Sequence, residues 1–389
     1  MSDEQKTPQT EDNFFSTIYY AFKRKITGYR PDFEQHIALF GESGSGKTTL
    51  LTFFYGYQAE SAFQKEAGYR LLAEDTTQGQ TLLNSYYKIT EKNLPGTRLA
   101  SREYRFTIRL NDVTDNIGRL VWHDYPGEWW TETKTGEEQA DKEKTFLSLM
   151  ASDVALFLVD GEKLKKEGDR YLKCLFCHFR DELCRIKATS SLKEKMPLEH
   201  CPRVWTICLT KSDLLPEITA EGFREYVLRV AYDEMKAVQQ EIKAIIKEPD
   251  FFNFGDDYLI LSVGEYDENN EKITNKNKHK GFDLIAPIAF TVPVKRARWW
   301  QEKKTSAVSV AGNTLEITRK LTTGWMKWIP FVGYYLGLLD QMTKKNVGNL
   351  LQKKEEAIKK GYFIDAVLIA FEQKLHSYGI EKTYIAPND

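Results

Sequence analysis

The sequence has no excess of charge of either sign. It contains 55 Lys and Arg residues against 56 Asp and Glu residues, which gives a formal net charge of −1. Proteins that bind nucleic acid through its phosphates usually carry a basic field. The chain as a whole has none, so we do not expect nucleic acid to be its partner.

Long apolar runs and a disulfide framework are also missing. The longest apolar run, Trp328 to Leu339, has 12 residues, whereas a membrane-spanning helix needs about 20. The segment Met1 to Asn13 is polar and acidic and lacks the basic and then apolar pattern of a signal peptide. Five Cys residues, an odd number, provide no disulfide framework. These absences favour a cytoplasmic protein.

The sequence does contain ample material for a folded core. Hydrophobic residues make up 41% of it and aromatic residues 13%, which is typical of globular proteins. Composition and periodicity predict a disordered tail over 1–13, an amphipathic helix over 14–33, a main domain over 34–290 with insertions at 58–103 and 187–203, and a mainly helical C-terminal extension over 291–389. We expect the helix over 14–33 to dock on the main domain, with contact to a membrane surface as the alternative.

Short apolar runs in the main domain predict β-strands. They are His36–Phe40, Tyr104–Leu110, Leu120–His123, Val154–Val159, Val204–Leu209 and Tyr258–Val263. Helical patterns separate the later runs, and the clearest spans Phe223–Ile246. This alternation predicts an α/β fold with a mostly parallel sheet and helices on both faces. A turn at Asn116-Ile117-Gly118 predicts a hairpin, and therefore one antiparallel strand pair.

The strongest motif of the chain is a glycine-rich segment that runs from Gly41 to Thr48. It follows a predicted strand and precedes a helical pattern, the context that a P-loop requires. The glycines let backbone N–H groups curl around phosphates, and the N-terminus of the helix adds partial positive charge. Lys47 would neutralise the β- and γ-phosphates, and the Thr48 hydroxyl would ligate Mg²⁺. The predicted phosphate-binding residues are Glu42, Ser43, Gly44, Ser45, Gly46, Lys47, Thr48 and Thr49.

A second motif, Asp124-Tyr125-Pro126-Gly127, follows the predicted strand Leu120–His123. An acid at the end of a strand can hold Mg²⁺, usually through water, and Gly127 frees a backbone N–H for a γ-phosphate. The pattern is weak alone, but its position two strands after a P-loop makes it specific.

Two further motifs predict recognition of the base. Thr210-Lys211-Ser212-Asp213 follows the strand Val204–Leu209. The carboxylate of Asp213 could accept hydrogen bonds from both N1–H and N2–H₂ of guanine, a paired donor edge that adenine lacks. The Lys211 stem would pack along the base plane. At Ser262-Val263-Gly264, after the last predicted strand, backbone N–H groups could meet the guanine O6.

The order of these motifs resembles the five-motif signature of Ras-like and translation-factor-related P-loop GTPases, over about residues 34–290. The string from Asp124 to Trp129 is similar to the switch of bacterial YcjX-like and double-GTPase families. The resemblance implies a P-loop G-domain with a six-stranded sheet, Mg²⁺-dependent binding of GTP and GDP, and switch loops that sense the γ-phosphate.

The same resemblance implies a Mg²⁺-binding threonine in a loop after the P-loop helix. Thr77, which precedes Gly79 by two residues, is the best candidate, with Thr76 and Thr81 as alternatives. The predicted metal ligands are then Thr48, Thr77 and Asp124.

Two positions depart from the family pattern. Thr210 stands where Asn is commoner, and Glu128 stands where Ras-like enzymes place a water-positioning Gln. No Arg lies three residues before Thr77, where some relatives carry an arginine finger. The resemblance therefore implies slow hydrolysis, in which Lys47, Thr77, Gly127 and Glu128 act on the reacting phosphate, accelerated by a partner or by self-association.

Together these features predict a GTP-binding switch with weak GTPase activity. The base site would consist of Thr210, Lys211, Asp213, Ser262 and Val263. The alternatives are a catalytically inactive scaffold that binds GTP or GDP, and a P-loop ATPase. We expect the switch loops and the C-terminal extension to contact a protein partner or a second copy of the chain. For the apolar stretch 325–339 within the extension, packing against the main domain is favoured over a partner surface, and membrane insertion comes last because the run is short.

Two other clusters favour structural roles. Cys174, Cys177 and His178 could join Cys184, His200 and Cys201 in a zinc site, but the spacing suits no standard one, so we expect buried thiols on a core helix. The basic residues around Trp299-Trp300, which include Lys295 and Arg296, favour a solvated charged face over contact with nucleic acid.

Overall fold

The computed structural model describes residues 34–89, 102–111, 116–124, 137–189, 193–194, 196–198, 201–266, 273–275, 278–306, 355 and 363–386. The predicted tail over 1–13, the predicted helix over 14–33 and the apolar stretch 325–339 lie outside these ranges. Within them, no helix is both long and apolar enough to cross a membrane.

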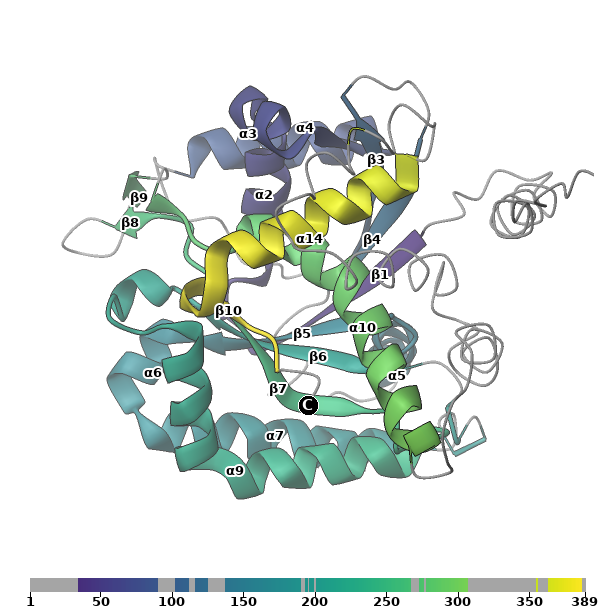
Figure 1. Ribbon diagram of the computed structural model, residues 1–389. Coiled ribbons are helices and arrows are strands. Elements are labelled where there is room, and N and C mark those ends of the chain that lie inside the picture. The colour runs from purple at the N-terminus through teal and green to yellow at the C-terminus, as the bar shows by residue number, and fades with distance from the viewer. Residues whose placement is uncertain are drawn as a thin grey trace, which may run out of the picture.

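An eight-stranded mixed sheet forms the centre of the molecule (Figure 1). In spatial order its strands are β10 (Thr383–Tyr384), β7 (Asn253–Ile260), β6 (Val204–Thr210), β5 (Val154–Asp160), β1 (Glu34–Phe40), β4 (Gly118–Asp124), β3 (Arg102–Leu110) and β2 (Tyr69–Ala73). The four central pairings, from β7 to β4, are parallel. The outer pairings, β10 with β7, β4 with β3 and β3 with β2, are antiparallel.

The expectation of six strands is wrong. Five of the predicted strands form close to their expected positions, whereas the predicted strand Tyr258–Val263 is observed earlier in the sequence, as β7 over Asn253–Ile260. β2 comes from the predicted insertion 58–103 and extends the sheet beyond β3. β10 comes from the C-terminal extension and pairs with β7. The predicted hairpin around Gly118 is confirmed by the antiparallel pairing of β3 with β4. A separate two-stranded sheet consists of β8 (Glu265–Tyr266) and β9 (Ile273–Asn275).

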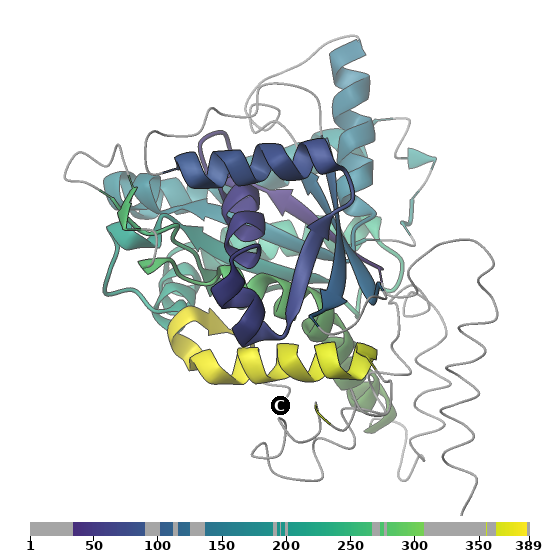
Figure 2. The same cartoon turned by 90° about the horizontal axis from the view of Figure 1, so that it is seen from above.

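Helices cover both faces of the sheet, as predicted (Figures 1 and 2). Side chains on one face pack with α2 (Lys47–Gln58), α3 (Ser61–Ala67), α4 (Thr76–Lys88), α10 (Ile285–Ser306) and α14 (Phe363–Lys382). Side chains on the other face pack with α5 (Glu137–Met150), α6 (Gly161–Glu167), α7 (Asp169–Lys187) and α9 (Ala220–Ile245). A short 3₁₀ helix, η2 (Ser212–Leu214), follows β6, and another, η4 (Phe282–Leu284), precedes α10.

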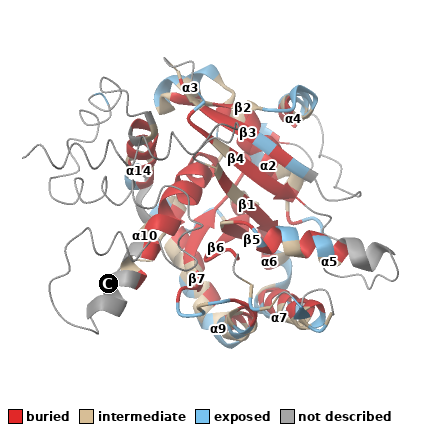
Figure 3. Ribbon diagram, turned by 90° about the vertical axis from the view of Figure 1, so that its right-hand side faces the viewer, coloured by how far each residue is buried: buried red, intermediate tan, exposed pale blue. Residues whose placement is uncertain are grey.

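The sequence of the central strands explains this layering. β5 and β6 are buried along their whole length, and their near-continuous apolar runs are typical of parallel strands covered on both faces (Figure 3). In β1 the side chains alternate, so that Ile37 and Leu39 join the core under α2 while Ala38 and Phe40 join the core under α7.

The C-terminal extension does not begin at a structural boundary. α10 runs through positions 290 and 291, and α14 packs against it in the core under α2. Arg296 of α10 is buried and forms an ion pair with Asp257 of β7. The expectation that Arg296 lies on a solvated face is therefore wrong. The sequence pattern does not show the ion pair, because Asp257 is 39 residues away in the sequence. These contacts join α10 and α14 to the main domain.

We expect replacement of Phe371 by Ala to destabilise the whole fold. This α14 side chain is 1% exposed and contacts the rings of Phe290 on α10 and Tyr69 on β2. Removing a buried Phe side chain usually costs about 3–5 kcal/mol. Urea denaturation should show a lower midpoint for Phe371→Ala and no shift for the exposed Ser377→Ala on the same helix. An unchanged midpoint for Phe371→Ala would show that α14 does not support the core.

Candidate functional site

The glycine-rich segment forms a tight loop between β1 and α2. Gly44 and Gly46 have φ angles of 81° and 90°, in the left-handed region that favours glycine. Gly41 lies so close to its surroundings that a Cβ there would come within 2.6 Å of Ser45 Oγ. The loop therefore depends on its glycines, and its shape presents the N-terminus of α2 to an anion.

Lys47, the first residue of α2, folds back over the loop. Its ammonium group donates hydrogen bonds to the carbonyl oxygens of Gly41 at 2.7 Å and of Glu42 at 2.9 Å. The side chain is buried, so its charge acts in a region of low dielectric. Thr48 and Thr49, in the first turn of the same helix, are half-buried. The predicted phosphate-binding residues thus come together in one loop and one helical turn.

Asp124 ends β4 at the same edge of the sheet. Because β4 pairs in parallel with β1, with His123 opposite Ala38, Asp124 lies near the end of β1 where the glycine-rich loop begins. Its side chain is 1% exposed. Gly127 and Glu128 lie outside the described residues, so their roles stay predictions.

Thr210 joins the predicted base site to the glycine-rich loop. Its hydroxyl lies 2.9 Å from the carbonyl oxygen of Ser45 in the loop and 3.2 Å from that of Val159 in β5, and its one proton is shared between them. The side chain is buried. A short hydroxyl side chain at this position is therefore sufficient to tie the end of β6 to the phosphate-binding loop.

Lys211 is held by two acidic side chains. Its backbone is left-handed, with φ at 50°, and its ammonium group donates to Asp160 Oδ2 at 2.9 Å and to Glu162 Oε2 at 3.0 Å. Burial opposes the charged form, but the two carboxylates outweigh it and raise the pKa of Lys211. The ammonium group stays charged, and its stem is fixed beside the predicted base motif.

Asp213 and Ser262 meet from separate elements. The Ser262 hydroxyl lies 2.7 Å from Asp213 Oδ1, and it accepts a hydrogen bond from the backbone N–H of Gly264 at 3.2 Å. Burial raises the pKa of Asp213, and the hydrogen bond from Ser262 opposes that rise. Val263, which lies between Ser262 and Gly264 in the sequence, is buried. The two predicted base motifs therefore form one constellation with a carboxylate at its centre.

The loop expected around Thr77 is not present. Residues Thr76 to Lys88 form helix α4, and the Asp75 side chain caps it by accepting hydrogen bonds from the N–H groups of Thr77 at 2.8 Å and Gln78 at 3.0 Å. Thr77 is exposed in the first helical turn. The assignment of Thr77 as a metal ligand stays a prediction.

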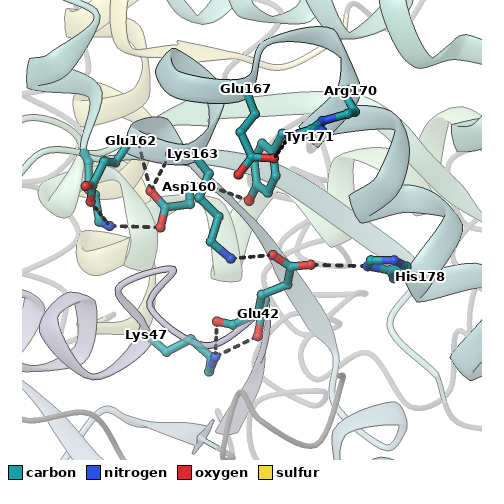
Figure 4. Close-up of polar contacts among 11 residues, drawn as sticks. Glu42, Lys47, Asp160, Glu162, Lys163, Glu167, Arg170, Tyr171 and His178 are labelled. Carbon is teal, nitrogen blue, oxygen red and sulfur yellow. Dashed lines mark hydrogen bonds and ion pairs between the residues drawn. The ribbon is translucent and has the colours of Figure 1, made fainter. Parts of the chain in front are cut away.

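Glu42 differs from the other residues of the loop in where its side chain points. Its carboxylate turns toward α6 and α7, where Lys163 Nζ lies 2.9 Å and His178 Nδ1 3.5 Å from it (Figure 4). Only the backbone carbonyl of Glu42 faces Lys47. The sequence pattern gave no indication of Lys163 or Asp160, and it placed His178 in a possible zinc cluster and not beside Glu42. For Asp160 a signal was available, because an acid ends the strand Val154–Asp160.

All five cysteines lie in the described part of the chain, whereas His200 lies outside it. Among the described residues, no group of three or more His, Cys, Asp or Glu side chains is placed to hold a metal ion. The expectation of buried thiols on α7 is wrong for Cys174, which is exposed, while Cys177 and Cys184 are half-buried. Cys201, just before β6, is buried, and its burial raises the pKa of its thiol to about 12.

We expect Thr210→Val to weaken nucleotide binding without unfolding the protein. The change keeps the shape of the side chain and removes the hydroxyl that ties β6 to Ser45. A hydrogen bond of this kind contributes about 1 kcal/mol, so affinity for labelled GDP should fall about fivefold. Thr210→Ser, which retains the hydroxyl, should bind as the wild type does. Equal affinity for all three proteins would refute a role for this bond.

Comparison with solved structures finds GTPase domains with low overall similarity. The Saccharomyces cerevisiae Ski7 GTPase-like domain bound to GTP is 14% identical over 63% of this chain and 44% of that chain, with a TM-score of 0.26. The same domain with GDP and inorganic phosphate is 13% identical over 66% and 47%, with a TM-score of 0.30. The chain thus spans less than half of either Ski7 structure.

A third structure is the signal recognition particle receptor SRb-GTP/SRX complex from Chaetomium thermophilum. It is 17% identical over 60% of this chain and 93% of that chain, with a TM-score of 0.31. TM-scores at this level support no argument about function. Among curated proteins, none matches the sequence.

The family model is the informative comparison. The model described as Double-GTPase 2 matches residues 35–254, more than half of the chain. That range includes β1, the glycine-rich loop, Asp124 and the segment from Thr210 to Asp213. The predicted resemblance to P-loop GTPases and to double-GTPase families is thereby confirmed, and the chain belongs to the Double-GTPase 2 family.

Proposed function

We propose that this protein is a Mg²⁺-dependent GTP-binding switch that hydrolyses GTP slowly to GDP and phosphate. The observation that carries the proposal is the constellation of Lys211, Asp213 and Ser262, joined to the glycine-rich loop by the bond between Thr210 and Ser45. A guanine base at Asp213 and phosphates at Lys47 would then be bound by one connected frame.

The base end supports guanine rather than adenine. A carboxylate in this position accepts two hydrogen bonds from the N1–H and N2–H₂ groups of guanine, and adenine offers no such pair. Ser262 orients the Asp213 carboxylate through Oδ1, and the Lys211 stem lies fixed beside it. This arrangement favours a GTPase over the P-loop ATPase that the glycine-rich loop alone would allow.

The phosphate end supports the participation of Mg²⁺. This ion binds oxygen ligands and is usually held by one or two protein groups together with substrate phosphates and water. The Thr48 hydroxyl and the buried Asp124 carboxylate are oxygen donors at the same edge of the sheet. They fit a site that is completed by the nucleotide. Lys47 would neutralise the phosphates, and the ion would stabilise the charge that develops during hydrolysis.

A protein partner, or a second copy of the chain, completes the proposal. No Arg lies three residues before Thr77, where some relatives carry an arginine finger, and Thr77 lies in a helix. Stimulation from outside would supply the missing positive charge at the transition state.

We predict that Asp213→Asn reverses base specificity. The asparagine amide replaces one acceptor by a donor, so it would lose the paired bonds to guanine and gain one to the C2 carbonyl of xanthine. Hydrogen bonds to charged groups contribute about 1.5–3 kcal/mol each, so GTP affinity should fall on the order of a hundredfold. Equilibrium titration with labelled GTP, xanthosine triphosphate and ATP measures the change. A preference of the wild type for ATP, or unchanged specificity in Asp213→Asn, would contradict the guanine site and place the protein among P-loop ATPases.

We also predict slow intrinsic hydrolysis. Under single-turnover conditions with Mg²⁺, the rate of phosphate release should stay below about 1 s⁻¹. Enzymes exceed this rate when a partner adds an arginine finger. Chelation of Mg²⁺ with EDTA and the change Asp124→Asn should each lower it further. Faster hydrolysis by the protein alone would contradict the proposal, and no release with tight GTP binding would favour an inactive scaffold.

A further inference from the structure

The glycine-rich loop contains an acidic side chain that no part of the proposed function uses. Glu42 is 10% exposed, and its carboxylate is negatively charged in a loop built to bind anions. Like charges in one region of low dielectric repel each other, so an uncompensated carboxylate here would oppose nucleotide phosphates. The structure must therefore offset this charge.

Lys163 provides the offset. Its ammonium group donates to Glu42 Oε2 at 2.9 Å, while His178 of α7 lies 3.5 Å from Oε1 (Figure 4). The Lys163 ammonium group also lies 5.8 Å from the centre of the Tyr171 ring. The hydroxyl of that tyrosine accepts a hydrogen bond from the backbone N–H of Asp160. Side chains of α6 and α7 thus hold the carboxylate of Glu42.

The position of Lys163 is set by the base site. Asp160 caps α6 by accepting hydrogen bonds from the N–H groups of Glu162 at 2.9 Å and Lys163 at 3.4 Å, and its other oxygen accepts from Lys211. The helix also begins in close contact with the base motif, because a Cβ on Gly161 would lie 2.4 Å from the carbonyl oxygen of Thr210. The first turn of α6 therefore links Lys211 to the loop.

We propose that Lys163 is a positioning residue of the nucleotide site, which neutralises Glu42 and holds the glycine-rich loop in register with the base motif. This inference rests on the proposed function, since it assigns Lys163 to the same guanine-nucleotide site. Lys163 acts through Glu42, the side chain that its ammonium group contacts. Its effect is electrostatic, so it depends on the presence of the Glu42 carboxylate.

The test is a double-mutant cycle read by equilibrium binding of fluorescent GTP and GDP with Mg²⁺. Lys163→Met should weaken GTP binding at least tenfold, and GDP binding less, because GTP carries the additional charge of the γ-phosphate. In the Glu42→Gln background, the same change at Lys163 should alter either affinity less than threefold. Lys163→Arg keeps the charge and should stay close to the wild type.

Lys165→Met is the matched control. Lys165 lies two residues away on the same short helix and is exposed, so the variant makes the same change of charge without touching Glu42. Circular dichroism and thermal melting establish that each variant is folded. If Lys163→Met does not fold, the comparison of Glu42→Gln with the double variant Glu42→Gln/Lys163→Met still reports whether Lys163 matters once the carboxylate is gone.

Equal GTP affinity for Lys163→Met and the wild type would overturn the inference, and so would a loss in Lys163→Met that Glu42→Gln does not rescue. Both results leave the proposed function intact, because the wild type binds GTP in each. A wild type that binds no guanine nucleotide would overturn the proposed function itself, and this inference with it.

Discussion

The parallel alignment of β1 with its two neighbours is the constraint on which the site depends. Since β4, β1, β5 and β6 run in the same direction, their carboxyl ends meet at one edge of the sheet. In spatial order, Asp124 ends β4, the glycine-rich loop follows β1, Asp160 ends β5 and Thr210 ends β6. Open parallel sheets bind ligands at this edge. The residues proposed to bind Mg²⁺, phosphate and base thus come from separate segments but lie at one edge of the sheet.

Asp160 connects Lys211 to the first turn of α6. One oxygen caps α6 and the other binds Lys211, so a single buried carboxylate sets the start of a helix and the position of a base-site ammonium group. The same helix carries Lys163 to Glu42 in the glycine-rich loop. The Thr210 hydroxyl makes a second link between the two ends of the site. Two polar routes, one through Asp160 and one through Thr210, therefore connect the proposed base site to the glycine-rich loop.

Sequence reasoning predicted the parts of the fold that local patterns encode. The six longer strands, the hairpin near Gly118 and the glycine-rich loop each carry a periodicity or a motif. β10 has two residues, and only its pairing with β7 makes it a strand, so no local pattern could reveal it. Arg296 looked solvated because its partner Asp257 is distant in sequence. The helix that contains Thr77 was predictable, since Asp75 is a favourable N-cap residue directly before it.

Charged side chains of α7 contact both the glycine-rich loop and α5, the next described helix after Asp124. His178 lies against Glu42, and Glu182, one turn later on α7, pairs with Lys142 of α5 at 2.6 Å. Both members of the second pair are almost fully buried, and removing one member of a buried pair leaves a costly unpaired charge. α5 therefore cannot move away from α7 without exposing or abandoning that pair. A displacement of α5 would therefore act on α7, the helix whose His178 lies 3.5 Å from Glu42 of the glycine-rich loop.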